Sequence, residues 1–144
     1  MFNKTTEYSI RVILLLGLET NQSSLLGVSA IAGKLSFPEA FIGKVLQSLV
    51  KIGLIKSIKG PGGGFFLHPE SYNLTILNIV EKVEGLNFLN KCGLGISSCN
   101  SDNPCPIHNE YNKVAESLTV ALSSKTVSEI NNEMRLGNYE LNYI

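Results

Sequence analysis

The chain has 144 residues, of which 44% are hydrophobic, and its twelve basic side chains balance twelve acidic ones. This length fits one globular domain with an extension. No apolar run is long enough to cross a bilayer, and the N-terminus lacks a signal-peptide cleavage pattern, so we expect a cytoplasmic protein with no membrane partner. With two histidines and no recognisable nucleophile–base pair or acidic dyad, the sequence indicates neither an enzyme nor a small-molecule substrate.

The charges are unevenly distributed. Residues 1–69 carry seven basic and three acidic side chains, whereas residues 70–144 carry five basic and nine acidic ones. A basic N-terminal half on an acidic C-terminal half is typical of a protein with one phosphate-facing surface. The alternative is unevenly distributed, solvated charge.

Three helices are predicted in the first third of the chain. Apolar residues recur at helical spacing over Thr6–Leu18 and again over Val28–Leu35. A third helix is predicted to begin at Ser36, because Ser36 and Glu39 match a capping box, and to end at Gly53. Its expected apolar face is Phe41, Ile42, Val45, Leu46, Leu49 and Ile52.

A glycine-rich stretch, "KGPGGGFFL" at 59–67, follows the three helices. A phosphate-binding loop would continue with Gly-Lys-Ser or Gly-Lys-Thr and a helix, but an apolar run of β-favouring residues follows instead. Together with the alternating "LIKSIK" at 54–59, the stretch predicts a β-hairpin. Three helices and a hairpin predict a mostly α winged helix-turn-helix with a small β-hairpin wing, whose third helix would enter the major groove of DNA.

The predicted DNA-binding residues are the outward-facing positions of the third helix and the wing. We expect Lys44 to contact a base edge or a phosphate, and the wing lysines to contact phosphates. The wing glycines would permit a tight turn and a close approach to DNA, or serve the turn alone. The predicted set is Ser36, Pro38, Glu39, Lys44, Gln47, Ser48, Lys56, Lys59, Gly62 and Gly63.

All three cysteines lie in a loop-like segment, 86–106, that follows an amphipathic segment ending at Gly85. Cys92, Cys99 and Cys105, with His108 beyond them, have the spacing C-x6-C-x5-C-x2-H. Thiolates select zinc, copper(I) or iron–sulfur clusters, and structural zinc sites usually show shorter C-x2-C or C-x4-C spacings. The spacing leaves a cluster, a zinc site and free thiols open.

The last predicted elements are a helix over Glu110–Ser123 and a short helix that starts at a second capping box, Thr126 and Glu129. The apolar stripe of the longer helix would serve a two-fold dimer or the core of a monomer.

These motifs together resemble the Rrf-two family of bacterial winged-helix regulators. The resemblance rests on "GLIKSIKGPGGGFFL", the helices before it, the segment ending in "EKVEG", the cysteine loop and the closing "TVSEI". It implies a winged helix-turn-helix DNA-binding domain at 1–84, a cluster-binding loop at 85–109, and a dimerisation helix with a C-terminal tail at 110–144. Within the family, the recognition helix often carries Tyr-Leu-Glu where this chain has Phe41-Ile42-Gly43, and a wing Arg where it has Lys59.

The resemblance also implies a function. The chain would be a homodimeric transcriptional repressor that binds a double-stranded DNA operator, and an iron–sulfur cluster sensing nitric oxide, redox or iron status would set its affinity. Cys92, Cys99 and Cys105 match the family's ligands. The fourth ligand would be His108, as in IscR-like members, or Glu7 of the partner subunit, as in NsrR-like members, so both 2Fe–2S and 4Fe–4S centres stay open. The alternative is a regulator that uses the three cysteines as a zinc site or thiol switch.

Overall fold

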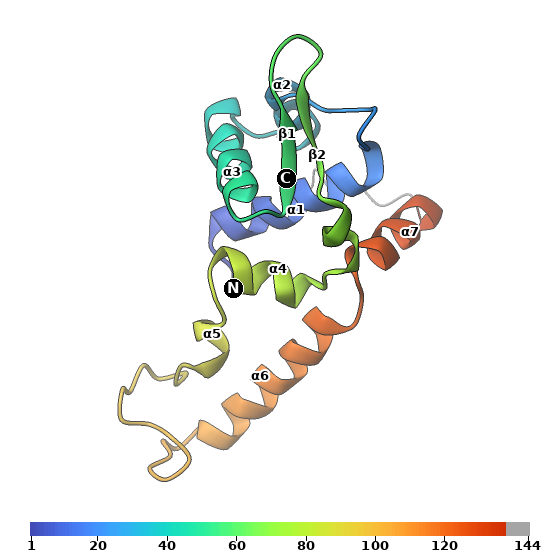
Figure 1. Ribbon diagram of the computed structural model, residues 1–144. Helices are drawn as coiled ribbons and strands as arrows, with labels where there is room; N and C mark the ends of the chain where they lie inside the picture. Colours follow the sequence, from blue (N-terminus) through green and yellow to red (C-terminus); the bar gives the residue numbers. More distant parts are fainter. Residues whose placement is uncertain (138–144) are drawn as a thin grey trace.

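The computed structural model describes residues 1–137, which form a mostly helical protein with one two-stranded hairpin. Helices α1 to α4, the hairpin and α7 gather into a winged-helix core, and helix α6 runs away from it toward the loop that joins α5 to α6 (Figure 1). This architecture confirms the predicted winged helix-turn-helix. The elements are α1 (Lys4–Glu19), α2 (Val28–Lys34), α3 (Glu39–Lys51), β1 (Ile55–Ile58), β2 (Gly64–Leu67), the 3-10 helix η1 (Pro69–Asn73), α4 (Ile76–Val83), α5 (Asn87–Asn90), α6 (His108–Ser123) and α7 (Val127–Gly137).

Helix α1 is the central helix of the core. The side chain of Asn3 caps it by accepting a hydrogen bond from the Thr6 N–H at 2.8 Å. Val12, Ile13 and Leu16 are fully buried, and α1 contacts α3, α4, β2 and α7. A helix covered on several sides needs apolar residues around most of its circumference, which is the pattern in the sequence.

The turn between α2 and α3 corrects one prediction, because Ser36 closes α2 instead of capping α3. Ser36 has a φ of +51°, the only left-handed backbone at a non-glycine residue within 1–137. The N–H groups of Ser36 and Phe37 donate to carbonyls of the last turn of α2 at 3.2 and 3.1 Å, which is a common helix C-terminal motif. Helix α3 begins at Glu39 with Pro38 as its N-cap and no side-chain cap bond. Two helices this close share one turn, and Ser36 can serve only one of them.

Helix α3 buries one face, and Gly53, two residues after its last residue Lys51, is the C-terminal stop that the sequence predicted. Gly53 has a φ of +78°, and its N–H and that of Leu54 close the last turn. Ile52, predicted for the apolar face, is instead 36% exposed, because it is the C-cap residue, where the chain already turns away. The buried residues of α3 are Ile42, Val45, Leu46 and Leu49.

Strands β1 and β2 form the predicted hairpin, paired antiparallel along all four residues of each strand. Two of the wing glycines are required by the turn itself. Gly62 has a φ of +73°, and a Cβ at Gly63 would lie 2.1 Å from the Ile58 carbonyl oxygen. The turn alone therefore accounts for these glycines, whatever the wing binds.

The last two helices have different environments. Helix α6 contains no buried residue, and Val114 and Val120 on it are 64% and 68% exposed. Helix α7 starts at the predicted Thr126–Glu129 capping box. It is longer than the short helix that the sequence indicated, and it packs back on α1. No helix within residues 1–137 has the length and apolarity needed to cross a membrane.

Candidate metal centre and nucleic-acid interface

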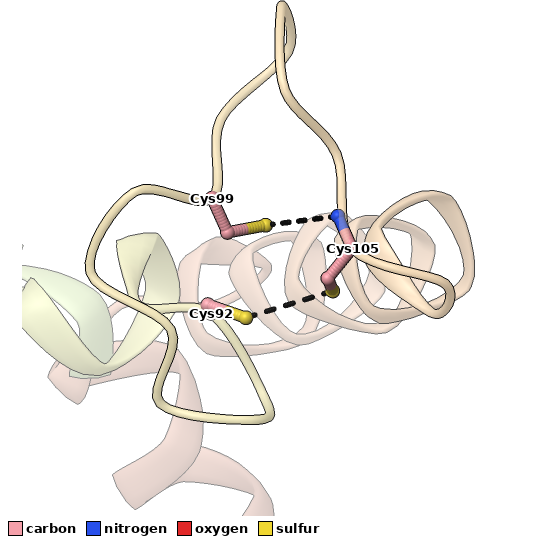
Figure 2. Close-up of side chains that lie close together, drawn as sticks. All are labelled: Cys92, Cys99 and Cys105. Atoms are coloured by element: carbon pink, nitrogen blue, oxygen red, sulfur yellow. Dashed lines mark hydrogen bonds between the residues drawn. The ribbon is translucent and has the colours of Figure 1, made fainter.

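The three cysteines lie together in the loop between α5 and α6. Their Sγ atoms are all within 4.8 Å of one another (Figure 2). The Sγ atoms of Cys92 and Cys105 are 3.6 Å apart, and the Cys105 N–H donates to the Cys99 Sγ at 3.3 Å. All three side chains are half-buried. A loop of irregular structure thus brings three thiols into one group.

Tight turns in the loop produce this convergence. The Gly95 N–H donates to the Cys92 carbonyl at 2.9 Å, the Cys99 N–H to Ile96 at 3.2 Å, and the His108 N–H to Cys105 at 3.0 Å. Each cysteine therefore belongs to a closed backbone turn, which fixes the direction of its side chain better than an open loop would.

The loop is also held against α6 by the ring of Tyr111. A Cβ at Gly93 would lie 2.5 Å from that ring. Only a glycine allows the backbone to approach the ring this closely with the ring where it is. Gly93, directly after Cys92, therefore packs against Tyr111 of α6.

The backbone also sets the acidity of the thiols. The N–H groups of Ile96 and Leu94 lower the pKa of Cys92 to about 7. For Cys99, the Cys105 N–H lowers the pKa, but burial and the neighbouring thiols outweigh it, and the pKa is raised. Three adjacent thiols resist simultaneous ionisation, and a bound cation would favour all three thiolates.

His108 lies beside this group. Its Nδ1 is 3.2 Å from the Cys99 Sγ, and its Nε2 is 3.0 Å from the Nδ2 of Asn112. The two ring nitrogens of His108 thus face the Cys99 thiol on one side and the Asn112 amide on the other. Asn112 was missed by the sequence analysis, although its position four residues after His108 on one helix face could have indicated it.

The other candidate fourth ligand, Glu7, lies apart from the cysteines of its own chain. It is on the first turn of α1, where its carboxylate is 3.9 Å from the Lys4 Nζ. Within residues 1–137, the group of converging metal-ligating atoms contains the three cysteines alone. The donor set within one chain is therefore three thiols with one imidazole beside them.

The predicted DNA-binding residues lie on the surface of α3, the turn before it and the wing. Nine of the ten are exposed and Gly63 is half-buried. Within the described chain, Lys44, Lys56 and Lys59 form no ion pair, whereas Lys34 is paired with Glu19 at 2.9 Å. The unpaired lysines leave a basic surface over α3 and the wing.

A hollow of about 480 Å³ separates α3 from the wing. It brings Gln47 of α3 together with Lys59 and Gly63 of the wing. Three of the predicted residues from two distant segments of the chain thus face one groove.

The comparisons with known proteins identify the family. A family model described as Rrf2, iron-dependent transcriptional regulator, matches residues 2–133. The chain belongs to the Rrf2 (Rrf-two) family. A candidate HTH-type transcriptional regulator of Aquifex aeolicus is 30% identical over 134 residues, which cover 92% of each chain. The regulator IscR of Vibrio cholerae is 24% identical over 123 residues, which cover 85% of this Rrf2 chain and 70% of IscR.

Solved structures share the fold of this Rrf2 protein. IscR of T. potens matches with a TM-score of 0.74 at 19% identity, covering 96% of this chain and 91% of that one. CymR, the global cysteine regulator of B. subtilis, matches with a TM-score of 0.73 at 18% identity, covering 92% and 97%. At these identities the likeness concerns the fold, and the family assignment makes the chain a transcriptional regulator and not an enzyme.

Proposed function

We propose that this Rrf2 protein is a cytoplasmic, homodimeric repressor whose affinity for a double-stranded DNA operator depends on an iron–sulfur cluster held by Cys92, Cys99 and Cys105. The observation that carries the proposal is the convergence of the three Sγ atoms within 4.8 Å, in a loop outside the core. The family's description as iron-dependent points to the same metal.

The donor chemistry of the loop fits such a group. Thiolates are the protein ligands of iron–sulfur clusters, and N–H groups directed at the sulfurs tune them. Here backbone N–H groups act on the sulfurs of both Cys92 and Cys99. A fourth ligand would be the imidazole of His108 or Glu7 of the partner subunit, completing a 2Fe–2S or 4Fe–4S centre. When bound, such a centre supplies reactivity toward nitric oxide, oxidants or iron depletion.

The basic surface would bind the operator. The third helix of a helix-turn-helix reads the major groove, and lysines that face phosphates contribute affinity without sequence information. Lys44, Lys56 and Lys59 are available for this role because no carboxylate in the described chain neutralises them. Gly43 stands where many family members carry Glu, and it removes a possible acceptor for cytosine, so the operator sequence of those relatives is not transferred.

The dimer proposal rests on the exposed face of α6. A hollow of about 640 Å³, lined by Leu86, Leu89, Ala115 and Val120 among others, runs between α5 and α6. Val114 and Val120 are mostly exposed on the same helix. A second copy of α6, packed across a two-fold axis, would cover this apolar surface. Sedimentation measurements test it, and a monomer at micromolar concentration would contradict it.

The decisive experiment for the cluster is purification without oxygen, followed by the visible spectrum and by iron and acid-labile sulfide analysis. We expect a brown protein with matching iron and sulfide, and colourless but folded dimers after serine replacement of Cys92, Cys99 or Cys105. Ser101→Ala, an exposed change in the same loop, is the matched control and should stay brown. A protein without iron or sulfide even after reconstitution would refute the proposal.

A zinc site or thiol switch is the second candidate. Two observations favour it: His108 lies beside Cys99, which makes a Cys3His set suited to zinc, and the Cys92 and Cys105 sulfurs are neighbours. The same analysis separates the candidates. Stoichiometric zinc without sulfide indicates the zinc site, and a mass loss of about 2 Da on oxidation, from the two thiol protons released as a disulfide forms, indicates the switch.

A further inference from the structure

The first eight residues contact both the base of the cysteine loop and the start of α3. In the ribbon the N-terminus lies beside α4, close to where the chain continues into α5 (Figure 1). Helix α1 then passes beneath α3. The cysteine loop and the recognition helix α3, which the proposed function must connect, therefore both lie next to the N-terminal segment.

The contacts on the loop side involve the end of α4 and α5. The Thr6 hydroxyl donates to the Glu84 carboxylate at 2.6 Å, and the Asn3 N–H donates to the same oxygen at 3.4 Å. The rings of Phe2 and Phe88 meet edge to face, with centroids 5.7 Å apart. Phe88 precedes the first cysteine by four residues. The first turn of α1 is thus fastened to the segment that leads into the cysteine loop.

The contacts on the DNA side form an aromatic cluster. The ring centroid of Tyr8 is 4.1 Å from that of Phe37 and 5.5 Å from that of Phe41, and the centroids of Phe37 and Phe41 are 4.9 Å apart. The Lys4 Nζ lies 5.8 Å from the centre of the Phe37 ring. Phe37 directly precedes the N-cap of α3, so this cluster fixes where the recognition helix begins.

Phe2 and Phe88 differ from the residues around them in one respect. Both lie outside the hydrophobic core cluster and its packed neighbours, whereas Tyr8, Phe37 and Phe41 belong to it. Core packing therefore does not account for the pair. This half-buried aromatic pair instead adds a specific contact between two segments that are far apart in the sequence.

We propose that residues 2–8 form a coupling segment that transmits displacements of the cysteine loop to the start of α3, with Phe2, Glu84 and Phe88 as its positioning residues. The proposal rests on the function proposed above. Residues from Lys4 onward belong to one continuous helix, so a shift at Phe88 or Glu84 would be passed along α1 to Tyr8 and the rings packed on it. A contiguous set of packed contacts is a physical route for such coupling.

The test uses Phe2→Leu, Phe88→Leu, the double variant, and Glu84→Ala, which removes the acceptor, with Glu81→Ala at an exposed position of α4 as the matched control. Operator Kd is measured for the cluster-loaded and the cluster-free full-length protein. For the wild type we expect a ratio of the two in the range of about 5 to 150. The ratio should fall at least about fivefold in each Phe variant and in Glu84→Ala, and stay unchanged in Glu81→Ala. In the double variant it should fall no further than in the single ones, because both changes break one contact.

A ratio that stays at the wild-type value in the Phe variants would overturn the coupling segment. A wild-type ratio of one would instead refute the cluster-dependent regulator. A second measurement does not depend on the cluster: hydrogen exchange of the amides of Phe37 and residues 39–42 in the cluster-free protein. We expect faster exchange in Phe2→Leu than in the wild type, with unchanged exchange in α7. Equal exchange at Phe37 and residues 39–42 would overturn the proposal by itself.

Discussion

Replacing two helical glycines with alanine is expected to change the stability of the protein in opposite directions. Gly17 lies in α1 and Gly43 in α3, and neither has a left-handed backbone. A glycine inside a helix is less favourable than alanine by about 1 kcal/mol. Replacing both by alanine therefore brings the same intrinsic gain, and only the surroundings can make the outcomes differ.

The surroundings of Gly17 oppose the change. A Cβ there would lie 2.3 Å from the Oδ1 of Asn131 and 3.3 Å from Leu67. Asn131 is 1% exposed, and its amide donates to the Leu14 carbonyl at 2.9 Å, so it cannot turn aside without breaking that bond. Overpacking costs about 1–3 kcal/mol, and an orphaned buried donor costs a similar amount. Because the two costs add and the helix gain offsets about 1 kcal/mol of them, we expect Gly17→Ala to destabilise the protein by about 1–5 kcal/mol.

The surroundings of Gly43 permit the change. The nearest atom to its added Cβ is a methyl group of Val28 at 3.9 Å, which is an ordinary contact. We expect Gly43→Ala to stabilise the protein by about 0.5–1 kcal/mol. For a chain of this size the two variants should then differ in Tm by at least roughly 5 °C.

The assay is thermal and urea unfolding at one fixed protein concentration, because dimerisation would make Tm depend on concentration. In an Asn131→Ala background the clash is absent, so Gly17→Ala should become neutral or stabilising. Equal shifts for Gly17→Ala and Gly43→Ala would refute the argument, and so would a Gly17→Ala effect that persists without Asn131.

Three other outcomes are expected. Lys44→Ala and Lys59→Ala should each weaken operator binding and reduce its salt slope by about 1 if the lysine contacts a phosphate; unchanged affinity and slope would mean that the DNA-binding face is misplaced. In the metal-free protein, Cys92 should be the first cysteine to be alkylated, at a rate that rises through about pH 7, because its pKa is lowered to about 7 and the thiolate is the reactive form. Mass spectrometry of peptides after brief iodoacetamide treatment measures this rate. A rate that rises only above pH 8 would contradict the prediction. The backbone N–H and the hydroxyl of Thr126 lower the pKa of Glu129, so the stability that the ionised carboxylate contributes should be present above the usual carboxyl pKa and be lost as pH falls through the lower pKa of the folded state. Glu129→Gln should flatten the plot of urea midpoint against pH in that acid range. An unaltered plot would exclude the Thr126–Glu129 cap as the source of the pH dependence.

Local patterns in the sequence were sufficient for the winged helix. The apolar rhythm of α3 predicts its buried face, because a helix has a fixed period, and Gly53 marks its end because glycine tolerates the left-handed backbone found there. The hairpin follows from alternating residues around a glycine-rich turn. In each case neighbours in the sequence determine the structure.

Local sequence patterns did not predict which of two neighbouring helices a turn residue belongs to. Ser36 has the residue type and spacing of an N-cap, yet it closes α2, because the shared turn admits one role only. Ile52 continues the helical rhythm of α3 but falls one residue beyond the helix. Spacing alone does not indicate which of two adjacent helices a turn residue serves.

The sequence by itself therefore determined the elements of the winged helix and the residue types of the candidate metal centre. The tertiary structure alone decided how distant segments meet. It packs Asn131 of α7 on Gly17 of α1, and it closes the turns that bring the sulfurs of Cys92, Cys99 and Cys105 within 4.8 Å. Helical and strand periods are local properties of the chain, whereas these contacts depend on how the completed elements pack and on the turns that join them.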